Sequence, residues 1–361
     1  MLHALKLLEP QKGWDFNDSF TCATPPCDVI SNSSFPSAPG FTYSVTVEDD
    51  PNDPDLDVVL DGNEIVVLVS TANGPSDSER QVQAYVNRTL VDFTSPGALY
   101  LPASSANFDF DQANNPGMFI TGDDTSYTDS NSDGWADSTE PANPVQQVTG
   151  VALTDDGVRS NFISALGSAR YNLVQGAGYL TSPFTSPSVF TTTDQIINVN
   201  QIAVNLFNNA STVKDLDGEH KTCSSGSPCV YGTDASPQIT YIREGSDHIH
   251  LDGYVTGSGI MVTEGKTHLY GNFEFHGLVI AVKEGLTAGT DPGTVSADYF
   301  SLRDNARIFG AVLLGPKEGA LVFQMQGNAK VYYNSNAIKE AESLCGECFP
   351  QPPGVFAWID K

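Results

Sequence analysis

Two short segments, Leu251-Asp-Gly-Tyr-Val255 and Leu269-Tyr-Gly-Asn-Phe273, share one pattern and lie 18 residues apart. At the same spacing, Gly259-Ile-Met-Val262 superposes on Gly277-Leu-Val-Ile280. Two further copies follow at longer spacing, Leu302-Arg-Asp-Asn-Ala306-Arg-Ile308-Phe-Gly310-Ala-Val-Leu313 and Met325-Gln-Gly327-Asn-Ala329-Lys-Val331. Each unit therefore predicts two short strands bent at a glycine.

Stacking of these units would bury two columns of apolar side chains. The first column is Leu251, Leu269, Leu302 and Met325, and the second is Val255, Phe273, Ala306 and Ala329. The strands of an ordinary antiparallel meander also alternate apolar and polar residues, but a meander does not keep glycines in register across four units. We therefore predict a β-solenoid, similar to a parallel β-helix, over residues 241–335. Asp304 would take the turn position that glycine holds in the other units, and residues 286–297 would form a protruding loop.

Upstream, residues 1–98 predict a different, antiparallel module. Three runs, 41–47, 64–70 and 80–90, alternate apolar and polar residues and are separated by turn-forming residues, which is typical of a β-meander. Before them, residues 1–9 carry leucines at helical spacing over about two turns, too few to span a bilayer and without the layout of a signal peptide. We expect the chain to begin partway along a longer helix, so that this module is a helix end plus a meander, as in pilins.

Two further regions complete a mainly β fold. Residues 99–240 predict an irregular α+β middle region with helices at 157–166 and 193–207, the second having a broad apolar stripe. Residues 336–361 predict a C-terminal helix and a disulfide-closed tail. The expected order is therefore pilin-like module, middle region, solenoid and tail.

The middle region contains the most specific chemical motif, Asp129-Ser-Asn-Ser-Asp-Gly-Trp-Ala-Asp-Ser-Thr-Glu140. Its oxygen-bearing positions match a twelve-residue calcium loop, with Gly134 at the turn. The predicted Ca²⁺ ligands are Asp129, Asn131, Asp133, the Trp135 carbonyl, Asp137 and a bidentate Glu140. The residues on both sides of the loop are typical of turns and not of helices. We therefore expect a calcium ion that stabilises this segment rather than a calcium sensor flanked by helices. A merely solvated acidic loop is the alternative.

Composition is consistent with cation binding. The chain has 361 residues, 44 of them acidic and 17 basic, which gives a formal charge of −27. Its field repels nucleic acid and anionic lipid surfaces and attracts divalent cations. The oxygen-rich turn at 49–57 is a second candidate ion site, but it fits no defined spacing, and we favour a solvated turn.

Six cysteines form three close pairs, Cys22/Cys27, Cys223/Cys229 and Cys345/Cys348. Tight pairs in an even number predict loop-closing disulfides and an oxidising compartment. A zinc site would need two pairs to converge, and the pairs' flanking residues favour disulfide loops. Cys345 and Cys348 have redox-motif spacing, but they follow a predicted helix instead of a strand-to-helix turn.

The catalytic motifs of common enzyme classes do not occur, and we predict a protein that is not an enzyme. Four histidines, His248, His250, His268 and His276, fall in the solenoid, where they would stack as a ladder or share a metal. Arg303, Asp304 and Arg307 lie close enough in sequence to suggest polysaccharide-lyase chemistry, although Asp304 is expected in a turn.

Several strings resemble PilX-type type IV pilus assembly proteins. They are Gly257-Ser-Gly-Ile-Met-Val262, Leu269-Tyr-Gly-Asn-Phe-Glu-Phe-His-Gly-Leu-Val-Ile280, Ile308-Phe-Gly-Ala-Val-Leu313 and Val331-Tyr-Tyr-Asn-Ser335, with weaker upstream matches at 43–86, 119–124 and 148–152. The resemblance implies a bacterial, extracellular or cell-surface pilus component whose partners are other pilins or pilus assembly proteins. It also implies a long apolar N-terminal helix, of which residues 1–9 could be only the tail. Membrane contact is therefore expected only through a helix not present here.

The expected function is thus a calcium-stabilised structural or adhesive component of a pilus, with surface polysaccharide as a further candidate partner and no nucleic acid. The alternatives are a secreted β-helix enzyme that degrades polysaccharide and a carbohydrate-binding module. The second alternative would use an exposed row of aromatic side chains, Tyr254, Tyr270, Tyr332 and Tyr333.

Overall fold

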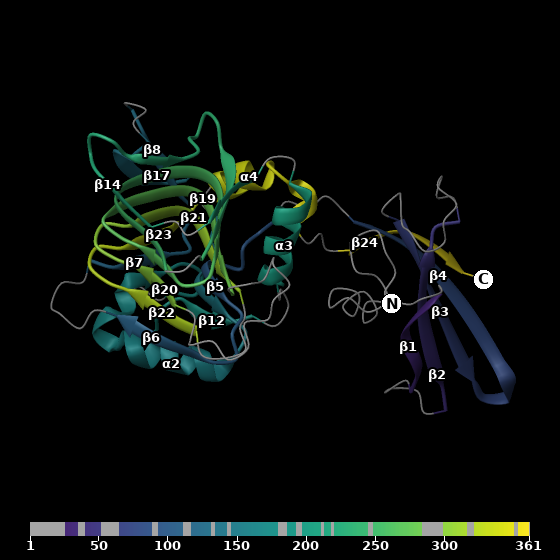
Figure 1. Ribbon diagram of the computed structural model, residues 1–361. Helices are drawn as coiled ribbons and strands as arrows, with labels where there is room; N and C mark the ends of the chain where they lie inside the picture. The colour runs from purple at the N-terminus through teal and green to yellow at the C-terminus, as the bar shows by residue number, and fades with distance from the viewer. Residues whose placement is uncertain are drawn as a thin grey trace. The chain divides into compact units, whose positions relative to one another are not determined.

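A computed structural model describes residues 26–34, 40–51, 65–88, 93–110, 117–130, 134–142, 146–179, 186–192, 197–210, 213–217, 220–244, 248–283, 299–315, 321–349 and 353–360. The chain forms two compact units (Figure 1). One unit consists of residues 1–91 and 350–361, and the other of residues 92–349. The protein is mainly β, as predicted, with an antiparallel sheet, a large curled parallel sheet and few helices.

The smaller unit is an antiparallel sheet in the order β1-β2-β3-β4-β24. Its strands are β1 (Cys27–Ser34), β2 (Thr42–Asp49), β3 (Ile65–Gly74), β4 (Ser78–Arg88) and β24 (Pro353–Asp360). Alternation buries one face, where Val45, Val47 and Leu68 are fully buried. The predicted meander is therefore confirmed, whereas the predicted helix at 1–9 lies outside the described residues. The addition of β24 from the far end of the chain was not expected.

Parallel strands of the repeat region build the larger unit. These are β17 (Ile249–Glu264), β18 (Thr267–Leu269), β19 (Asn272–Val282), β20 (Tyr299–Leu302), β21 (Arg307–Leu314), β22 (Leu321–Met325) and β23 (Lys330–Tyr333). On β17 and β19, Val255 pairs with Phe273 in parallel, at the predicted 18-residue offset. The strands of one repeat unit are called a rung below. The prediction that rungs stack in parallel register is confirmed.

The predicted interior columns are present. Leu251 pairs with Leu269, Leu269 with Leu302, and Leu302 with Met325. The four residues are fully buried, and so are Val255, Phe273, Ala306 and Ala329 of the second column. Because apolar area removed from water stabilises a fold by about 25 cal/mol per Å², these columns are a major source of the rungs' cohesion.

Glycine is required where neighbouring rungs bend together. Gly277 and Gly310 have φ angles of 129° and 145°. A Cβ on Gly277 would lie 2.0 Å from the carbonyl oxygen of Gly259, and one on Gly310 would lie 1.8 Å from that of Gly277. At the other bend Asp304 has a φ of 59°, which confirms that it takes the turn position of glycine.

The prediction of an irregular middle region is wrong for most of its strands, which extend the same parallel sheet. They are β5 (Gly97–Leu101), β6 (Ala106–Phe110), β7 (Phe119–Thr121), β10 (Thr149–Leu153), β11 (Val174–Gln175), β12 (Val189–Thr191), β13 (Val213–Asp217), β14 (His220–Cys223), β15 (Cys229–Tyr231) and β16 (Gln238–Arg243). β6 pairs with β22 and β7 with β23, so residues 106–110 and 119–121 lie beside strands that follow them in sequence by more than 200 residues. These strands lack the glycine repeat, which explains why their stacking was missed.

Three helices cover the parallel sheet, α2 (Asp156–Leu166), α3 (Val199–Asn209) and α4 (Ser335–Glu342) (Figure 1). The prediction of α2 is confirmed within one residue, α3 begins at Val199 rather than at the predicted residue 193, and α4 is the predicted C-terminal helix. The Asp155 side chain caps α2 by accepting from the Val158 N–H at 2.9 Å, and Asn334 caps α4 in the same way. The helices in the described part of the chain are too short or too polar to cross a membrane. Short 3₁₀ turns occur at η1 (Pro75–Asp77), η2 (Ser168–Leu173) and η3 (Gly346–Cys348).

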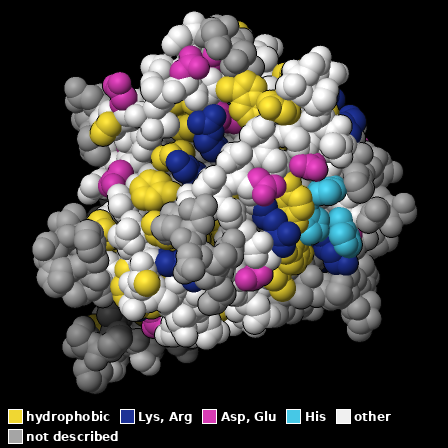
Figure 2. Space-filling view, turned by 90° about the vertical axis from the view of Figure 1, so that its left-hand side faces the viewer, with side chains coloured by type: hydrophobic (Ala, Val, Ile, Leu, Met, Phe, Trp, Pro, Cys, Tyr) yellow, Lys and Arg dark blue, Asp and Glu magenta, His cyan; other side chains and the backbone are white. Residues whose placement is uncertain are grey.

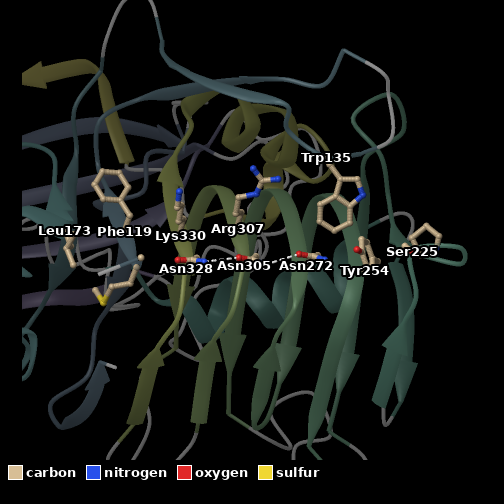
Figure 3. A pocket seen from close by; sticks show the side chains of 13 residues that line it. Phe119, Trp135, Leu173, Ser225, Tyr254, Asn272, Asn305, Arg307, Asn328 and Lys330 are labelled. Carbon is tan, nitrogen blue, oxygen red and sulfur yellow. Dashed lines mark hydrogen bonds between the residues drawn. The ribbon is translucent and has the colours of Figure 1, made fainter. Parts of the chain in front are cut away.

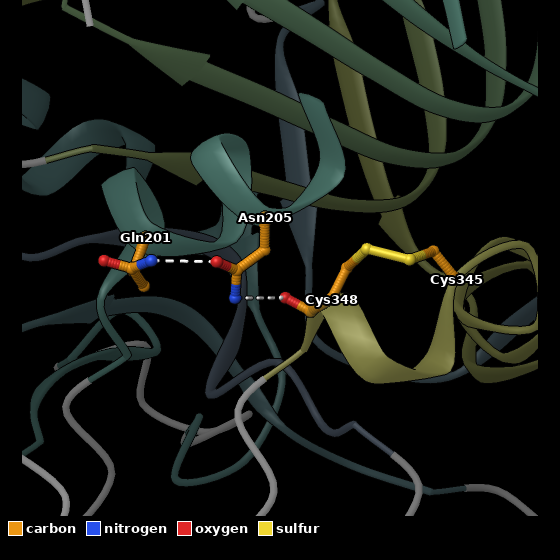
Figure 4. Close-up of a disulfide and its surroundings, with 4 residues drawn as sticks. All are labelled: Gln201, Asn205, Cys345 and Cys348. Atoms are coloured by element: carbon orange, nitrogen blue, oxygen red, sulfur yellow. Dashed lines mark hydrogen bonds between the residues drawn. A yellow bond between two sulfur atoms is a disulfide. The ribbon is translucent and has the colours of Figure 1, made fainter. Parts of the chain in front are cut away.

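Two of the predicted disulfides are formed, Cys223–Cys229 and Cys345–Cys348. The turn closed by Cys345 and Cys348 is attached to α3, because the Asn205 side-chain amide donates to the Cys348 carbonyl at 3.4 Å (Figure 4). Gln201 in turn donates to the Asn205 side-chain oxygen at 2.8 Å. Cys27 is also disulfide-bonded, and its predicted partner Cys22 lies outside the described residues.

Candidate functional site

β8 (Thr125–Thr128) and β9 (Ser138–Pro141) form an antiparallel hairpin. The predicted calcium loop begins directly after β8, and its residues 138–140 lie in β9. Gly134 has a φ of 84°, so the sixth loop position makes the left-handed turn expected of it. The Asp129 carboxylate at the first position accepts from the Gly134 N–H at 2.9 Å. First and sixth positions are thereby held together, as in a loop that folds back on a cation.

The remaining predicted ligands are only partly described. Asp137 accepts from the Ser130 N–H at 2.9 Å, and Glu140 is exposed on β9 opposite Ser126. Asn131 and Asp133 lie outside the described residues. Within the described part of the chain no group of three or more His, Cys, Asp or Glu side chains is arranged to hold a metal. The calcium site therefore stays a prediction.

The loop is fixed to the outer face of three successive rungs. The Thr256 hydroxyl donates to the Gly134 carbonyl at 2.6 Å. On the next rung Glu274 accepts from the Ala136 N–H, and on the third Arg307 donates to the Ala136 carbonyl at 3.3 Å. Thr256, Glu274 and Arg307 are register partners, so one column of side chains binds the loop backbone.

A buried charge network lies beneath the hairpin. Glu274 is fully buried and pairs with Arg307 at 2.5 Å and with the His276 Nε2 at 3.0 Å. The His276 Nδ1 lies 2.9 Å from the Asp234 carboxylate, which also accepts from the Tyr127 hydroxyl at 3.0 Å. A buried carboxylate is costly unless it is paired, and here two cationic side chains pair it.

The network shifts the proton affinities of its members. Burial alone would lower the pKa of His276, but its hydrogen bonds to Asp234 and Glu274 outweigh burial and raise it to about 9. Burial would raise the pKa of Asp234, and the hydrogen bond with His276 lowers it instead. Burial and the neighbouring Asp234 raise the pKa of Tyr127. The favoured state is an ion pair of His276 with the two carboxylates, with Tyr127 neutral.

Beside the hairpin lies a groove with a volume of about 1040 Å³ (Figure 3). Its floor contains three asparagines on adjacent rungs. The Asn305 amide donates to the Asn272 side-chain oxygen at 3.2 Å, and the Asn328 amide donates to that of Asn305 at 3.2 Å. The ladder runs across the strands, with Tyr254 opposite Asn272 on the preceding rung.

Aromatic and cationic side chains border the ladder. The rings of Trp135 and Tyr254 meet edge to face, 6.1 Å apart. Arg307 and Lys330 are register partners on β21 and β23, two residues beyond Asn305 and Asn328 respectively. Figure 3 shows Trp135, Arg307 and Lys330 above the row of asparagines. The groove thus combines amides, aromatic surface and two cations.

Sequence reasoning missed this groove. The signal was present, because Asn occurs directly before the apolar residue of the second column in three units, at Asn272, Asn305 and Asn328. Its meaning depends on the rungs being stacked in register. Trp135 lines the groove because the hairpin lies over the sheet. No local sequence pattern predicts that position of the hairpin.

The predicted histidine ladder is confirmed in its register. His250 pairs with His268 on β17 and β18, and their ring centroids lie 5.7 Å apart. The ring of His248 lies 5.5 Å from that of His268. In Figure 2 the histidines gather in one surface cluster beside acidic and basic side chains. His276 is separate from them in its contacts, in the network under the hairpin.

The residues considered for lyase chemistry have different partners. Arg303 donates to Gln324 at 2.8 Å and lies over the Tyr270 ring at 5.1 Å. Asp304 accepts from the N–H of Gly271, in the turn of the preceding rung, at 3.3 Å. Arg307 pairs with Glu274. The three side chains therefore support the rungs separately.

The four tyrosines proposed for a sugar-binding row do not form one. Tyr254 is 39% exposed, but Tyr332 and Tyr333 are 9% and 2% exposed. Tyr332 stacks on Phe309 with ring centroids 4.9 Å apart, in a small apolar cluster with Ala136 of the hairpin. Of this set, Tyr254 lines the groove.

No protein-family model matches the sequence, and no curated protein matches it. Among solved structures, the chain is similar to the competence-associated pilin ComZ from Thermus thermophilus. The match has a TM-score of 0.32 and 10% sequence identity, and it covers 98% of this chain and 91% of that chain. Similarity at this level is too low to assign a function.

Proposed function

We propose that this protein is a non-enzymatic component of a type IV pilus or a related pilin-like filament, displayed outside the cell and stabilised by calcium. The supporting observation is the separate antiparallel sheet, which has its own apolar core and follows a predicted helix end. That order of helix and meander is what the resemblance to PilX-type proteins implies. The small unit would attach to the filament.

The larger unit would be the displayed body, a β-solenoid-like stack. Its interior columns, side-chain ladders and docked hairpin favour a stiff scaffold over a mobile one. The Cys223–Cys229 and Cys345–Cys348 disulfides suit an oxidising, extracellular setting. A stiff body of this kind can present a binding surface away from the filament.

Calcium would fix the outermost part of the hairpin. Asp129, with its hydrogen bond to Gly134, has the geometry expected of a first ligand, and Asn131, Asp133, the Trp135 carbonyl, Asp137 and Glu140 would complete the set. Carboxylate and carbonyl oxygens are the donors that Ca²⁺ prefers. The ion would neutralise several of the chain's excess negative charges at this loop.

Fractionation of filaments from producing cells tests the filament role. The protein should appear with sheared filaments, and immunogold labelling against residues 92–349 should decorate them. Val47→Asp places a charge in the core of the small unit, where Val47 is fully buried, and should abolish the association. Val230→Asp, at a position 45% exposed on the larger unit, should leave it unchanged. Recovery of the wild-type protein solely in filament-free fractions would contradict the proposal.

A further inference from the structure

We propose that the groove beside the hairpin binds an extended neutral glycan. The sugar rings would lie against Trp135 and Tyr254, and the hydroxyl groups would bond to the ladder of Asn272, Asn305 and Asn328. This inference rests on the binding surface that the proposed function gives to the larger unit, and it names the ligand class.

The amide ladder matches a polyol in its hydrogen bonding. An asparagine amide has two N–H donors and an oxygen with two lone pairs. The ladder uses one N–H of Asn305 and one of Asn328, and one lone pair of Asn272 and one of Asn305. Each amide therefore keeps donor and acceptor capacity. A sugar hydroxyl donates and accepts in the same way, so a row of amides can bond to successive hydroxyls.

The spacing of the ladder suits a chain rather than a single sugar. The three asparagines lie on three consecutive rungs, and neighbouring strands in a sheet are about 4.8 Å apart. The floor therefore spans roughly 10 Å, to which the Tyr254 rung adds one further step. A volume of about 1040 Å³ is at the upper end of that of small-molecule sites, and is ample for several sugar rings.

The aromatic wall supplies the apolar contact that a sugar ring needs. Trp135 is partly exposed and Tyr254 is 39% exposed, and both border the groove. Aromatic side chains at binding sites provide large contact areas with little loss of conformational entropy. Trp135 is held from behind, since Gly134 and Ala136 on either side of it bond to Thr256, Glu274 and Arg307.

The charges favour a neutral ligand. Arg307 is paired with the buried Glu274, so it contributes a donor more than a net charge. The chain as a whole carries −27, and its field opposes the approach of a polyanion. Lys330 can donate to a hydroxyl without requiring a carboxylate partner.

Calorimetric titration of the purified chain tests the inference. The probes are maltohexaose, cellohexaose and mannohexaose, with hexagalacturonate as the acidic comparison. We expect at least one neutral hexamer to bind and to exceed hexagalacturonate in affinity. No binding of any neutral hexamer at millimolar concentration, or tighter binding of hexagalacturonate, would overturn the proposal.

Two matched pairs of variants locate the site. Tyr254→Ala and Asn305→Ala should each weaken binding about tenfold. Phe190→Ala, which removes a ring 36% exposed on β12, and Asn107→Ala on β6 should leave affinity unchanged. Melting temperatures check that each variant is folded. Equal losses in the control variants would place binding elsewhere and overturn the assignment.

These results are independent of the filament role, because the titration uses the purified chain. Binding without filament association would remove the pilus proposal and keep the groove. Filament association without glycan binding would support the pilus proposal and overturn the assignment of the groove.

Discussion

At the residue scale, the tightest constraint on this fold is the row of glycines where rungs bend together. A Cβ on Gly277 would lie 2.0 Å from the Gly259 carbonyl oxygen, and the φ of 129° is strained for any other residue. We expect Gly277→Ala to lower the free energy of unfolding of the larger unit by about 3 kcal/mol or more, measured by denaturant titration.

Gly226 provides the matched control. It lies in the Cys223–Cys229 loop, and a Cβ there would meet nothing within 4 Å. Gly226→Ala should change the free energy of unfolding by less than about 0.5 kcal/mol. Equal stability of the two variants would show that the rungs can separate at the bend without cost.

His276 makes the docking of the hairpin dependent on pH. Its pKa is raised to about 9 in the folded protein from the ordinary 6.5, because Asp234 and Glu274 bond to the protonated ring. The resulting stabilisation, on the order of 3 kcal/mol, is fully present below pH 6.5 and is lost as pH rises from 6.5 through 9. Hydrogen exchange of the β8–β9 amides should therefore accelerate over this range beyond the intrinsic rate increase.

His276→Gln tests this interpretation. The glutamine keeps hydrogen-bonding capacity but cannot take a proton, so the extra acceleration between pH 6.5 and 9 should vanish. Tyr127, Asp234 and Glu274 contact His276, and the raised pKa of Tyr127 keeps its hydroxyl protonated over this range. Persistence of the full pH effect in His276→Gln would assign it to another group.

At the element scale, the hairpin is where the calcium prediction can be decided. Removal of calcium by a chelator should lower the melting temperature and make residues 123–144 sensitive to protease, because the acidic loop would lose its counter-ion. Asp133→Ala should reproduce both effects in the presence of calcium. Melting and cleavage that are the same with and without chelator, and in this variant, would remove the calcium site.

The elements differ in how far the sequence specifies them. The rungs from β17 to β23 were predictable, because the glycine turns and apolar columns recur in each unit. Helices α2, α3 and α4 were predictable from caps and apolar stripes. Strands β5, β6 and β7 were not, because they stack on strands far later in the sequence and carry no repeat of their own. The asparagine ladder lies on the predictable rungs of β19, β21 and β23, whereas the groove above it also needs Trp135 of the hairpin, whose position no repeat predicts.

At the scale of the whole molecule, the two units have separate apolar cores. One core is centred on Val45, Val47 and Leu68, and the other contains the interior columns of the rungs. We expect two unfolding transitions in calorimetry. Val45→Ala should lower the free energy of unfolding of the smaller unit, and Leu278→Ala that of the larger unit. Each change should be about 2 kcal/mol or more, because both residues are fully buried. A single transition lowered by both variants would mean that the units unfold together.

The strand β24 has a consequence for biosynthesis. Until residues 353–360 leave the ribosome, the outer edge of β4 has no neighbour, and it stays unpaired while some 260 residues are translated. At ordinary translation speeds this interval is on the order of tens of seconds. An open strand edge is a template for pairing with another chain, so the β4 edge is available for such pairing through that interval, and its polar and charged residues limit that pairing. Completion of the first sheet therefore waits for residues 353–360.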